Sequence, residues 1–311
     1  MSDRVLAWTV RGLWALLPFT VWPAIGAALR HQPSAVRTTA VVGAWAVWGV
    51  VLLAALVRAP VGLTTLRCAA PAVLAASVAA VFTGHPSAAA MVVAVGWSAV
   101  LTAVVFLPSM AIVWVNGPAY ANERRFPLVA PGPLLLGPIE VAWALLVGLP
   151  PAAALVHAGG LWVLGGVLAA AAVPTVVVLG RALHGLSRRW LVFVPAGVVV
   201  HDRASLAEPV LFQRRIIASL APAPGGASAA GAGPAPGGPS GGRLDLTHGA
   251  PGLALELRLL EPVPLALAPR REASEEQAAW GVVVTPGRPG EALAYAAAHR
   301  VPVETQPRGG S

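Results

Sequence analysis

The chain has 311 residues, of which 57% are hydrophobic, and a mean hydropathy of +0.73, which lies above the usual range for soluble proteins and indicates an integral membrane protein. A net charge of +8 would suit a nucleic-acid ligand, but residues 1–186 carry nine arginines against three acids, so the excess flanks the apolar segments and we expect no nucleic acid as a partner. Cys68 is the sole cysteine, which excludes an intramolecular disulfide and a Cys-based metal cluster.

Six apolar stretches approach the length that a membrane helix requires. About 20 apolar residues cross the roughly 30 Å of hydrocarbon in a bilayer. The third stretch is short and reaches back toward Ala59 if Arg67 extends its side chain to the surface. The sequence therefore predicts a helical transmembrane domain over residues 1–186, with spans at about 12–29, 38–57, 68–83, 88–115, 133–156 and 161–180.

The arginines between these spans predict the orientation. Cytoplasmic segments carry an excess of basic residues. If the N-terminus is cytoplasmic, the outer segments hold only Arg30 and Arg37, whereas the inner segments hold Arg4, Arg11, Arg58, Arg67, Arg124, Arg125, Arg181, Arg188 and Arg189. With six spans, both termini are then on the cytoplasmic side of the cell membrane.

Glu140 is the acid that stands within a predicted span, about eight residues from its start. An ionisable side chain in lipid is costly and by default marks a function, such as an ion pathway. A structural ion pair, with Arg11 or a juxtamembrane arginine, is the alternative. In the loop before this span, Tyr120 and Phe126 flank a charged cluster that includes Arg124 and Arg125. That loop suits anionic lipid headgroups or docking on a soluble domain, and it is equally explained as an ordinary basic loop.

Residues 190–200 are apolar but do not form another span. Eleven residues are too few to cross a bilayer, and Pro195 and Gly197 interrupt them. Two runs rich in β-branched and aromatic residues, WLVFV and VVV, are joined by turn residues, which predicts a β-hairpin. The hairpin opens a β-rich cytoplasmic domain over residues 187–311.

Further short strands are predicted along this domain. They fall at about 208–213, 214–220, 244–247, 253–260, 263–269 and 280–285, and a final helix begins at Pro289 and runs to about His299. Of the 23 residues from 221 to 243, 22 are Ala, Gly, Pro or Ser, and this composition predicts a disordered insertion. A small sheet or barrel closed by a C-terminal helix is expected.

Three motifs carry a resemblance to a known family: NERRFPL at 122–128, RRWLVFVPAGVVVHD at 188–202 and TPGRPGEAL at 285–293. Together they resemble a group of uncharacterised actinobacterial multi-pass membrane proteins with a C-terminal bacterial PH-like domain. The resemblance implies a PH-like fold for the C-terminal domain and supplies no activity. The insertion at 221–243 departs from a compact PH-like sheet.

The sequence contains no catalytic or metal-binding motif that we would assign. GxSxG, Walker, HExxH and strand-linked GxGxxG patterns are missing, and His31, His85 and His157 stand alone in predicted outer loops. We therefore expect no catalytic residue, no metal and no cofactor. Arginines that could contact lipid or a partner are Arg124, Arg125, Arg188, Arg189, Arg214 and Arg215.

Two functions from different classes follow. The first is a non-enzymatic membrane scaffold or anchor, whose cytoplasmic PH-like module binds a protein partner or anionic lipid. The alternative is a small transporter or channel with Glu140 in its pathway. Small residues in the spans, such as Gly96, Gly148, Gly165 and Gly166, allow close helix packing and a possible homo-oligomer.

Overall fold

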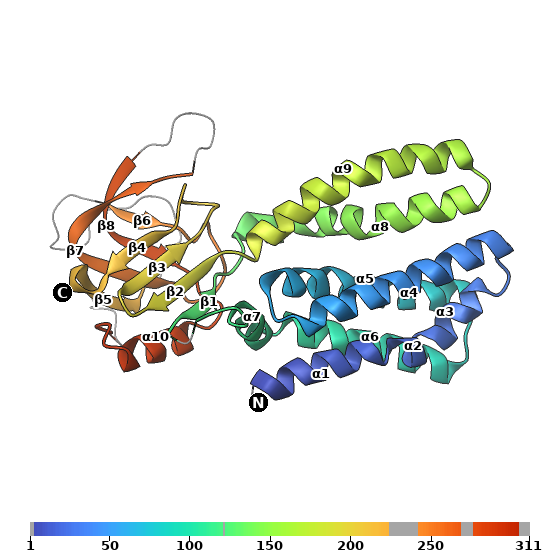
Figure 1. The fold of residues 1–311 in the computed structure, drawn as a ribbon, viewed down its shortest axis with the longest axis horizontal. Coiled ribbons are helices and arrows are strands. Elements are labelled where there is room, and N and C mark those ends of the chain that lie inside the picture. Colours follow the sequence, from blue (N-terminus) through green and yellow to red (C-terminus); the bar gives the residue numbers. More distant parts are fainter. Residues whose placement is uncertain (1–2, 121, 224–241, 269–275, 305–311) are drawn as a thin grey trace. The chain divides into compact units, whose positions relative to one another are not determined.

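The computed structural model describes residues 3–120, 122–223, 242–268 and 276–304. These residues fall into two units, coloured along the sequence in Figure 1. The helical unit comprises Met1–Pro118 and Glu140–His184, and the β unit comprises Ala119–Ile139 and Gly185–Ser311. The β unit is thus assembled from two separate parts of the chain, which differs from the single division at residue 187 predicted from the sequence.

Five helices in the described residues are long and apolar enough to cross a membrane. They are α4 (Ser34–Leu56), α5 (Pro60–Gly84), α6 (Ala88–Phe106), α8 (Pro138–Ala158) and α9 (Trp162–Leu186). Helix α5 starts at Pro60, so Arg67 lies within it. These helices support a membrane protein, as the composition predicted.

The predicted first span at 12–29 is interrupted in the structure. It falls on α1 (Asp3–Ala15), α2 (Leu17–Thr20) and α3 (Trp22–Leu29). Pro18 and Pro23 lie in the first turns of α2 and α3, where a missing N–H is tolerated. Proline also leaves the carbonyl four residues earlier without its helical donor, so the helix breaks at these points.

The predicted span at 88–115 is also divided, into α6 and α7 (Pro108–Val115). Leu107 has the extended backbone (φ −57°, ψ 134°) that a residue before proline favours. Six of the eight residues of α7 are buried, including Trp114. Helices α1, α5 and α6 pack against α7, and their residues Val10, Leu63, Leu66 and Leu101 are buried.

Indole groups join the helices of this unit through backbone carbonyls. Trp48 Nε1 donates to the Trp14 carbonyl at 3.1 Å, and Trp14 Nε1 donates to the Trp48 carbonyl at 3.0 Å. Trp97 Nε1 donates to the Leu13 carbonyl at 2.9 Å. Because Trp14 lies four residues before Pro18, Trp48 supplies the donor that the proline removes.

The predicted small-residue positions contribute little packing within the chain. A Cβ atom added at Gly96, Gly148 or Gly166 would meet no atom within 4 Å, whereas one at Gly165 would collide with His157 at 2.6–2.7 Å. Of these four glycines, only Gly165 is therefore required by a close approach inside the chain, at the turn that joins α8 to α9.

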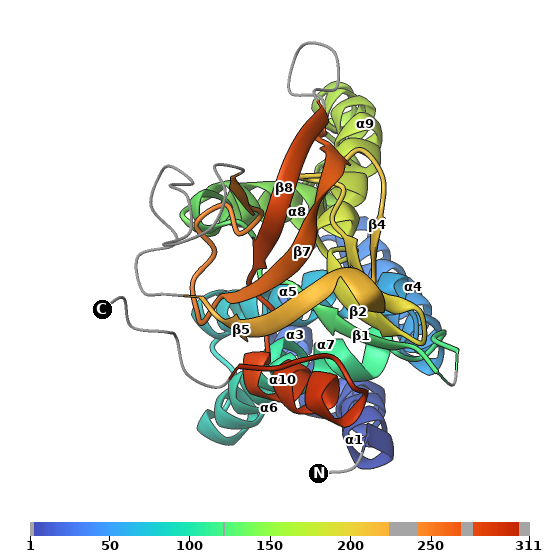
Figure 2. The same ribbon diagram turned by 90° about the vertical axis from the view of Figure 1, so that its left-hand side faces the viewer.

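Two four-stranded sheets and a helix make up the β unit (Figure 2). The first sheet has the order β1 (Arg124–Pro127), β2 (Trp190–Val194), β3 (Gly197–His201) and β4 (Val210–Gln213), all antiparallel. The second has the order β5 (Ile217–Pro222), β7 (Leu255–Ala266), β8 (Glu276–Val284) and β6 (Arg243–Asp245), with β6 parallel to β8. Two 3-10 turns, η1 (Gly132–Leu135) and η2 (Arg214–Ile216), complete the connections.

The two sheets are joined at two corners. Leu128 bridges Pro286 beyond the end of β8, and Leu206 bridges Leu267 beyond the end of β7. Their inner faces bury Phe126, Leu191, Val198, Phe212, Leu220, Leu257 and Val282. Helix α10 (Pro289–Ala298) packs against β5 and places Tyr295 against the rings of Phe126 and Phe193.

Several predictions for the β unit are confirmed, and one is wrong. The hairpin at 190–200 and the final helix from Pro289 are present. The strands predicted at 253–260 and 263–269 are not separate, because β7 is one long strand that continues through Pro262 and Pro264, and its register shifts between Arg258 and Val263. Residues 224–241 of the predicted insertion lie outside the described residues.

Candidate functional site

Glu140 is the third residue of α8, in its first turn, and its side chain is exposed within the chain. The sequence placed it about eight residues into a span, but the helix starts at Pro138, after η1 and a turn. A carboxylate in the first turn of a helix is stabilised by the unsatisfied N–H groups and by the helix dipole. The position of Glu140 at the start of a helix therefore explains the presence of an acid here, and no ion pathway is needed to explain it.

Arg11 was one of the expected partners of Glu140, and the structure gives it a different role. Its Nε donates to the Ala55 carbonyl at 3.1 Å and its Nη2 donates to the Leu56 carbonyl at 2.8 Å. Ala55 and Leu56 are the last residues of α4, where carbonyls lack helical donors. Arg11 therefore caps the C-terminus of α4.

Arg124 and Arg125 belong to a strand rather than to a simple loop. They open β1, which pairs with β2. Arg125 forms an ion pair with Glu123 at 2.7 Å and lies 5.0 Å from the centre of the Trp190 ring. Its hydrogen bond holds the pKa of Glu123 below the ordinary value, with burial opposing this shift. Arg125 is thus engaged within the β unit.

The environment of Arg189 differs most clearly from the sequence prediction. It was assigned to the cytoplasmic membrane boundary as a possible lipid contact, yet only 2% of the residue is exposed. Its Nε and Nη2 donate to Asp202 Oδ1 and Oδ2, each at 2.7 Å. Nη1 also donates to the Val129 carbonyl at 3.0 Å. Arg189 holds three segments of the β unit together and cannot reach a headgroup.

Ser205 and His248 extend this buried network. Ser205 Oγ lies 2.7 Å from Asp202 Oδ2 and 2.6 Å from His248 Nε2. The hydroxyl donates to the carboxylate, so the histidine nitrogen has to act as the donor to Oγ. A catalytic triad needs the opposite arrangement, in which histidine accepts the serine proton and the acid orients the histidine. The network therefore stabilises the fold of the β unit and does not have the geometry of a catalytic triad.

Asp202 is ionised at neutral pH in this setting. Burial by itself raises the pKa of the carboxyl group, but hydrogen bonds from Arg189 and Ser205, the Arg189 charge and the Ala204 N–H together hold the pKa below its ordinary value of 3.8. The buried Arg189 is therefore matched by a full negative charge.

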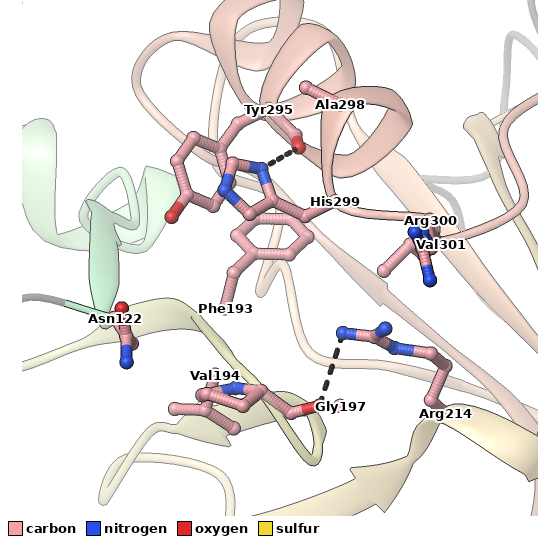
Figure 3. Close-up of a pocket in the computed structure, with 11 residues that line it drawn as sticks. Asn122, Phe193, Val194, Gly197, Arg214, Tyr295, Ala298, His299, Arg300 and Val301 are labelled. Carbon is pink, nitrogen blue, oxygen red and sulfur yellow. Dashed lines mark hydrogen bonds between the residues drawn. The ribbon is translucent and has the colours of Figure 1, made fainter.

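A pocket of about 330 Å³ opens in the β unit beside the β2–β3 turn and the end of α10. Its lining residues are Asn122, Phe193, Val194, Pro195, Gly197, Arg214, Tyr295, Ala298, His299, Arg300 and Val301. Figure 3 shows the rings of Phe193, Tyr295 and His299 on one side and Arg214 and Arg300 on the other. None of these eleven lining residues is acidic, so the pocket is cationic.

Arg214 is held at the pocket by the β2–β3 turn. Its Nη2 donates to the Pro195 carbonyl at 3.1 Å, while its Nε is buried with no hydrogen-bond partner among the described residues. Gly197, in the same turn, has φ +155°, and a Cβ there would collide with the Phe212 carbonyl. The turn therefore requires glycine, and its Pro195 carbonyl holds the guanidinium of Arg214 at the pocket.

The aromatic side of the pocket is built from α10. The rings of Tyr295 and His299 are stacked with centroids 3.8 Å apart, and His299 Nδ1 lies 2.8 Å from the Tyr295 carbonyl. Nδ1 is therefore the donor in this contact, and the Tyr295 carbonyl near the helix end is satisfied. Arg300 follows with φ +60°, a left-handed conformation that turns the chain after the helix.

Sequence reasoning found Arg214 but not the rest of this site. Arg215, its predicted neighbour, is exposed and does not line the pocket, and Arg188 is half-buried, with its carbonyl 2.7 Å from His201 Nδ1. Phe193, Tyr295, His299 and Arg300 were not proposed, because each has an ordinary structural explanation in its own element. No local pattern marks residues that meet from β2 and α10.

In the part of the chain that the structure describes, no three His, Cys, Asp or Glu side chains are grouped so as to hold a metal ion. Comparison of the chain with protein-family models, curated proteins and solved structures finds no match. The pocket is therefore interpreted from its own geometry and charge.

Proposed function

We propose that this protein is a non-enzymatic membrane scaffold or anchor, in which membrane-spanning helices hold the β unit at the cytoplasmic face, where it binds a protein partner or anionic lipid. The observation that carries the proposal is the cationic pocket lined by Arg214 and Arg300, with no acid among its eleven lining residues. Two positive charges, of which Arg214 is held by the Pro195 carbonyl, favour an anionic ligand.

A PH-like fold for the β unit is part of the proposal. Two packed sheets with a terminal helix support it, as does the antiparallel order of the first four strands. The parallel strand β6 departs from a simple meander. The alternative of a transporter with Glu140 in its pathway gains no support from a carboxylate in the first turn of α8.

Purification of the full-length chain from membranes by a mild detergent tests the proposal. Proteins and lipids that remain bound are identified by mass spectrometry for the wild type, for the double variant Arg214→Gln/Arg300→Gln and for the control Arg215→Gln. We expect a partner protein or an anionic lipid with the wild type and the control, and its loss with the double variant. Equal recovery from all three forms would contradict the proposal, as would recovery of nothing specific from the wild type.

The cytoplasmic placement has its own test. Reporter fusions after Arg37, Arg125 and Ser187 should be located outside, inside and inside, respectively. A label that cannot cross the membrane and yet marks the C-terminus in intact cells would place the β unit on the wrong side for this function.

A further inference from the structure

The pocket in the β unit combines an apolar surface with positive charge. Apolar surface comes from Phe193, Val194, Ala298 and Val301 together with the ring of Tyr295. Positive charge comes from Arg214 and Arg300, on the other side in Figure 3. A ligand that fits has to bring an apolar group and an anionic group within a few ångströms of each other.

The volume restricts the size of this ligand. About 330 Å³ lies at the lower end of the range of roughly 300–1,000 Å³ that small-molecule sites occupy. A folded surface cannot enter such a space, whereas one or two residues at the end of a peptide can. The pocket is therefore suited to a chain terminus more than to a broad protein interface.

The cationic side favours a carboxylate or phosphoryl group, and the apolar side decides between them. A guanidinium pairs with either anion through parallel N–H donors. A bare phosphate or a sugar-phosphate headgroup is polar on every side, and it would leave its hydroxyls unsatisfied against Val194, Ala298 and Val301. A carboxylate next to an aliphatic or aromatic side chain satisfies both sides of the pocket.

We infer that this pocket binds the carboxyl-terminal residue of a partner protein, with the terminal carboxylate on Arg214 and Arg300 and an apolar side chain against Tyr295 and His299. The hydrogen bond from Arg214 Nη2 to the Pro195 carbonyl holds this guanidinium at the pocket. Capture of a chain terminus by fixed donors is a recurrent mode of peptide recognition. This inference rests on the proposed function and selects a protein partner over a lipid.

Fluorescent peptides provide the test, with the full-length protein in phosphatidylcholine nanodiscs. The probe is fluorescein-Gly-Ser-Gly-Ser-Phe with a free carboxylate, compared with its C-terminal amide and with a peptide that ends in Gly. We expect the free acid to bind about tenfold more tightly than the amide, because the amide loses the charge that pairs with both arginines. The Phe-ended peptide should also bind about tenfold more tightly than the Gly-ended one, because Gly leaves the apolar side empty.

Matched variants assign the binding to the pocket. Arg214→Gln and Arg300→Gln should each weaken the binding of the free-acid peptide about tenfold. Arg215→Gln should leave this binding unchanged, because Arg215 does not line the pocket. Ala298→Trp fills the pocket without changing a charge and should abolish binding. The unfolding temperature of each variant is the control. A variant that unfolds at the same temperature as the wild type but binds less peptide has lost binding and kept its fold.

Three results would overturn the inference. The first is equal binding of the free-acid and amide peptides, and the second is no binding of the Phe-ended peptide up to millimolar concentration. The third is unchanged peptide binding by the Ala298→Trp variant. Displacement experiments with inorganic phosphate and with phosphatidylglycerol nanodiscs identify a phosphoryl or lipid ligand instead. Such a ligand would contradict the carboxylate assignment but leave the proposed function in place, whereas the proposed function itself fails if the pocket variants retain every partner and lipid in the purification experiment.

Discussion

Arg189 and Asp202 form a buried, two-pronged ion pair in the β unit, with both nitrogen–oxygen distances at 2.7 Å. The residues are 2% and 1% exposed. Charges removed from water to this extent are tolerated only when geometry and further hydrogen bonds compensate for the lost hydration. The Val129 and Leu246 carbonyls and the Ser205 hydroxyl supply those bonds.

Removing one partner of this ion pair should strongly destabilise the β unit. Asp202→Ala leaves the Arg189 charge buried without its partner, and we expect the free energy of unfolding of the β unit to fall by about 3–5 kcal/mol. Denaturant unfolding followed by amide hydrogen exchange in β2 and β3 measures the change. The double variant Arg189→Met/Asp202→Leu removes both charges and should be clearly more stable than Asp202→Ala. A double variant that is as unstable as the single one would show that the pair is not the cause.

The same pair predicts an acid limit for stability. The pKa of Asp202 in the folded chain is lowered below its ordinary value of 3.8, so the carboxylate stabilises the fold at a pH above that value. This stabilisation is lost as the pH falls below about 4 and through the folded-state pKa, because the unfolded chain then binds the proton more readily. Unfolding midpoints measured between pH 3 and 7 should fall steeply at the acidic end for the wild type and less steeply for Asp202→Asn. Parallel curves for the two proteins would assign the acid sensitivity to other groups.

The indole donors of the helical unit should stabilise the break at Pro18. Trp48→Phe removes the donor to the Trp14 carbonyl, and we expect a loss of about 1 kcal/mol, the scale of a hydrogen bond between membrane helices. Unfolding in mixed detergent micelles measures it. Trp162→Phe is the control, since Trp162 is 71% exposed and its indole makes no hydrogen bond that is seen in the described residues.

Pro18→Ala tests the cause of that effect. Alanine restores an N–H four residues after Trp14, so the carbonyl regains a helical donor. In the Pro18→Ala background, Trp48→Phe should therefore cost less than in the wild type. An unchanged cost would indicate that Trp48 acts through packing alone.

Glu140→Gln separates the two functional classes. A carboxylate in the first turn of α8 interacts favourably with the helix dipole, so we expect a small loss of stability, about 0.3–1 kcal/mol, and no change in pocket binding. Proteoliposomes loaded with a pH-sensitive dye or a cation indicator measure flux. A flux in the wild type that Glu140→Gln removes would favour the transporter.

Local features of the sequence were enough for the main elements. A helix that spans a membrane needs length and low charge, and both can be counted along the chain, so α4, α8 and α9 were predicted, although their ends were misplaced by up to six residues. The hairpin at 190–200 depends on β-branched residues and a two-residue turn, which are also local. Pro289 fixed the start of α10 for the same reason.

The prolines within the spans mark the limit of this reasoning. Their presence was evident, but whether Pro18 or Pro108 breaks a helix depends on which neighbouring donors satisfy the freed carbonyls. In this chain the indole of Trp48, from another helix, satisfies the Trp14 carbonyl that Pro18 frees. That compensation is a property of packing.

The sequence by itself determined a helical membrane protein followed by a β-rich region, because span length, alternation and turn residues act over a few neighbouring positions. Only the tertiary structure decided that Arg124–Pro127 is the first strand of that region, that Arg189 is buried on Asp202 while Arg214 lines a pocket, and that Tyr295 and Arg300 face the β2–β3 turn. Strand pairing and the environment of a charge depend on contacts between residues far apart in the chain. Arginines that are equivalent in the sequence therefore acquire different roles only when the fold surrounds them.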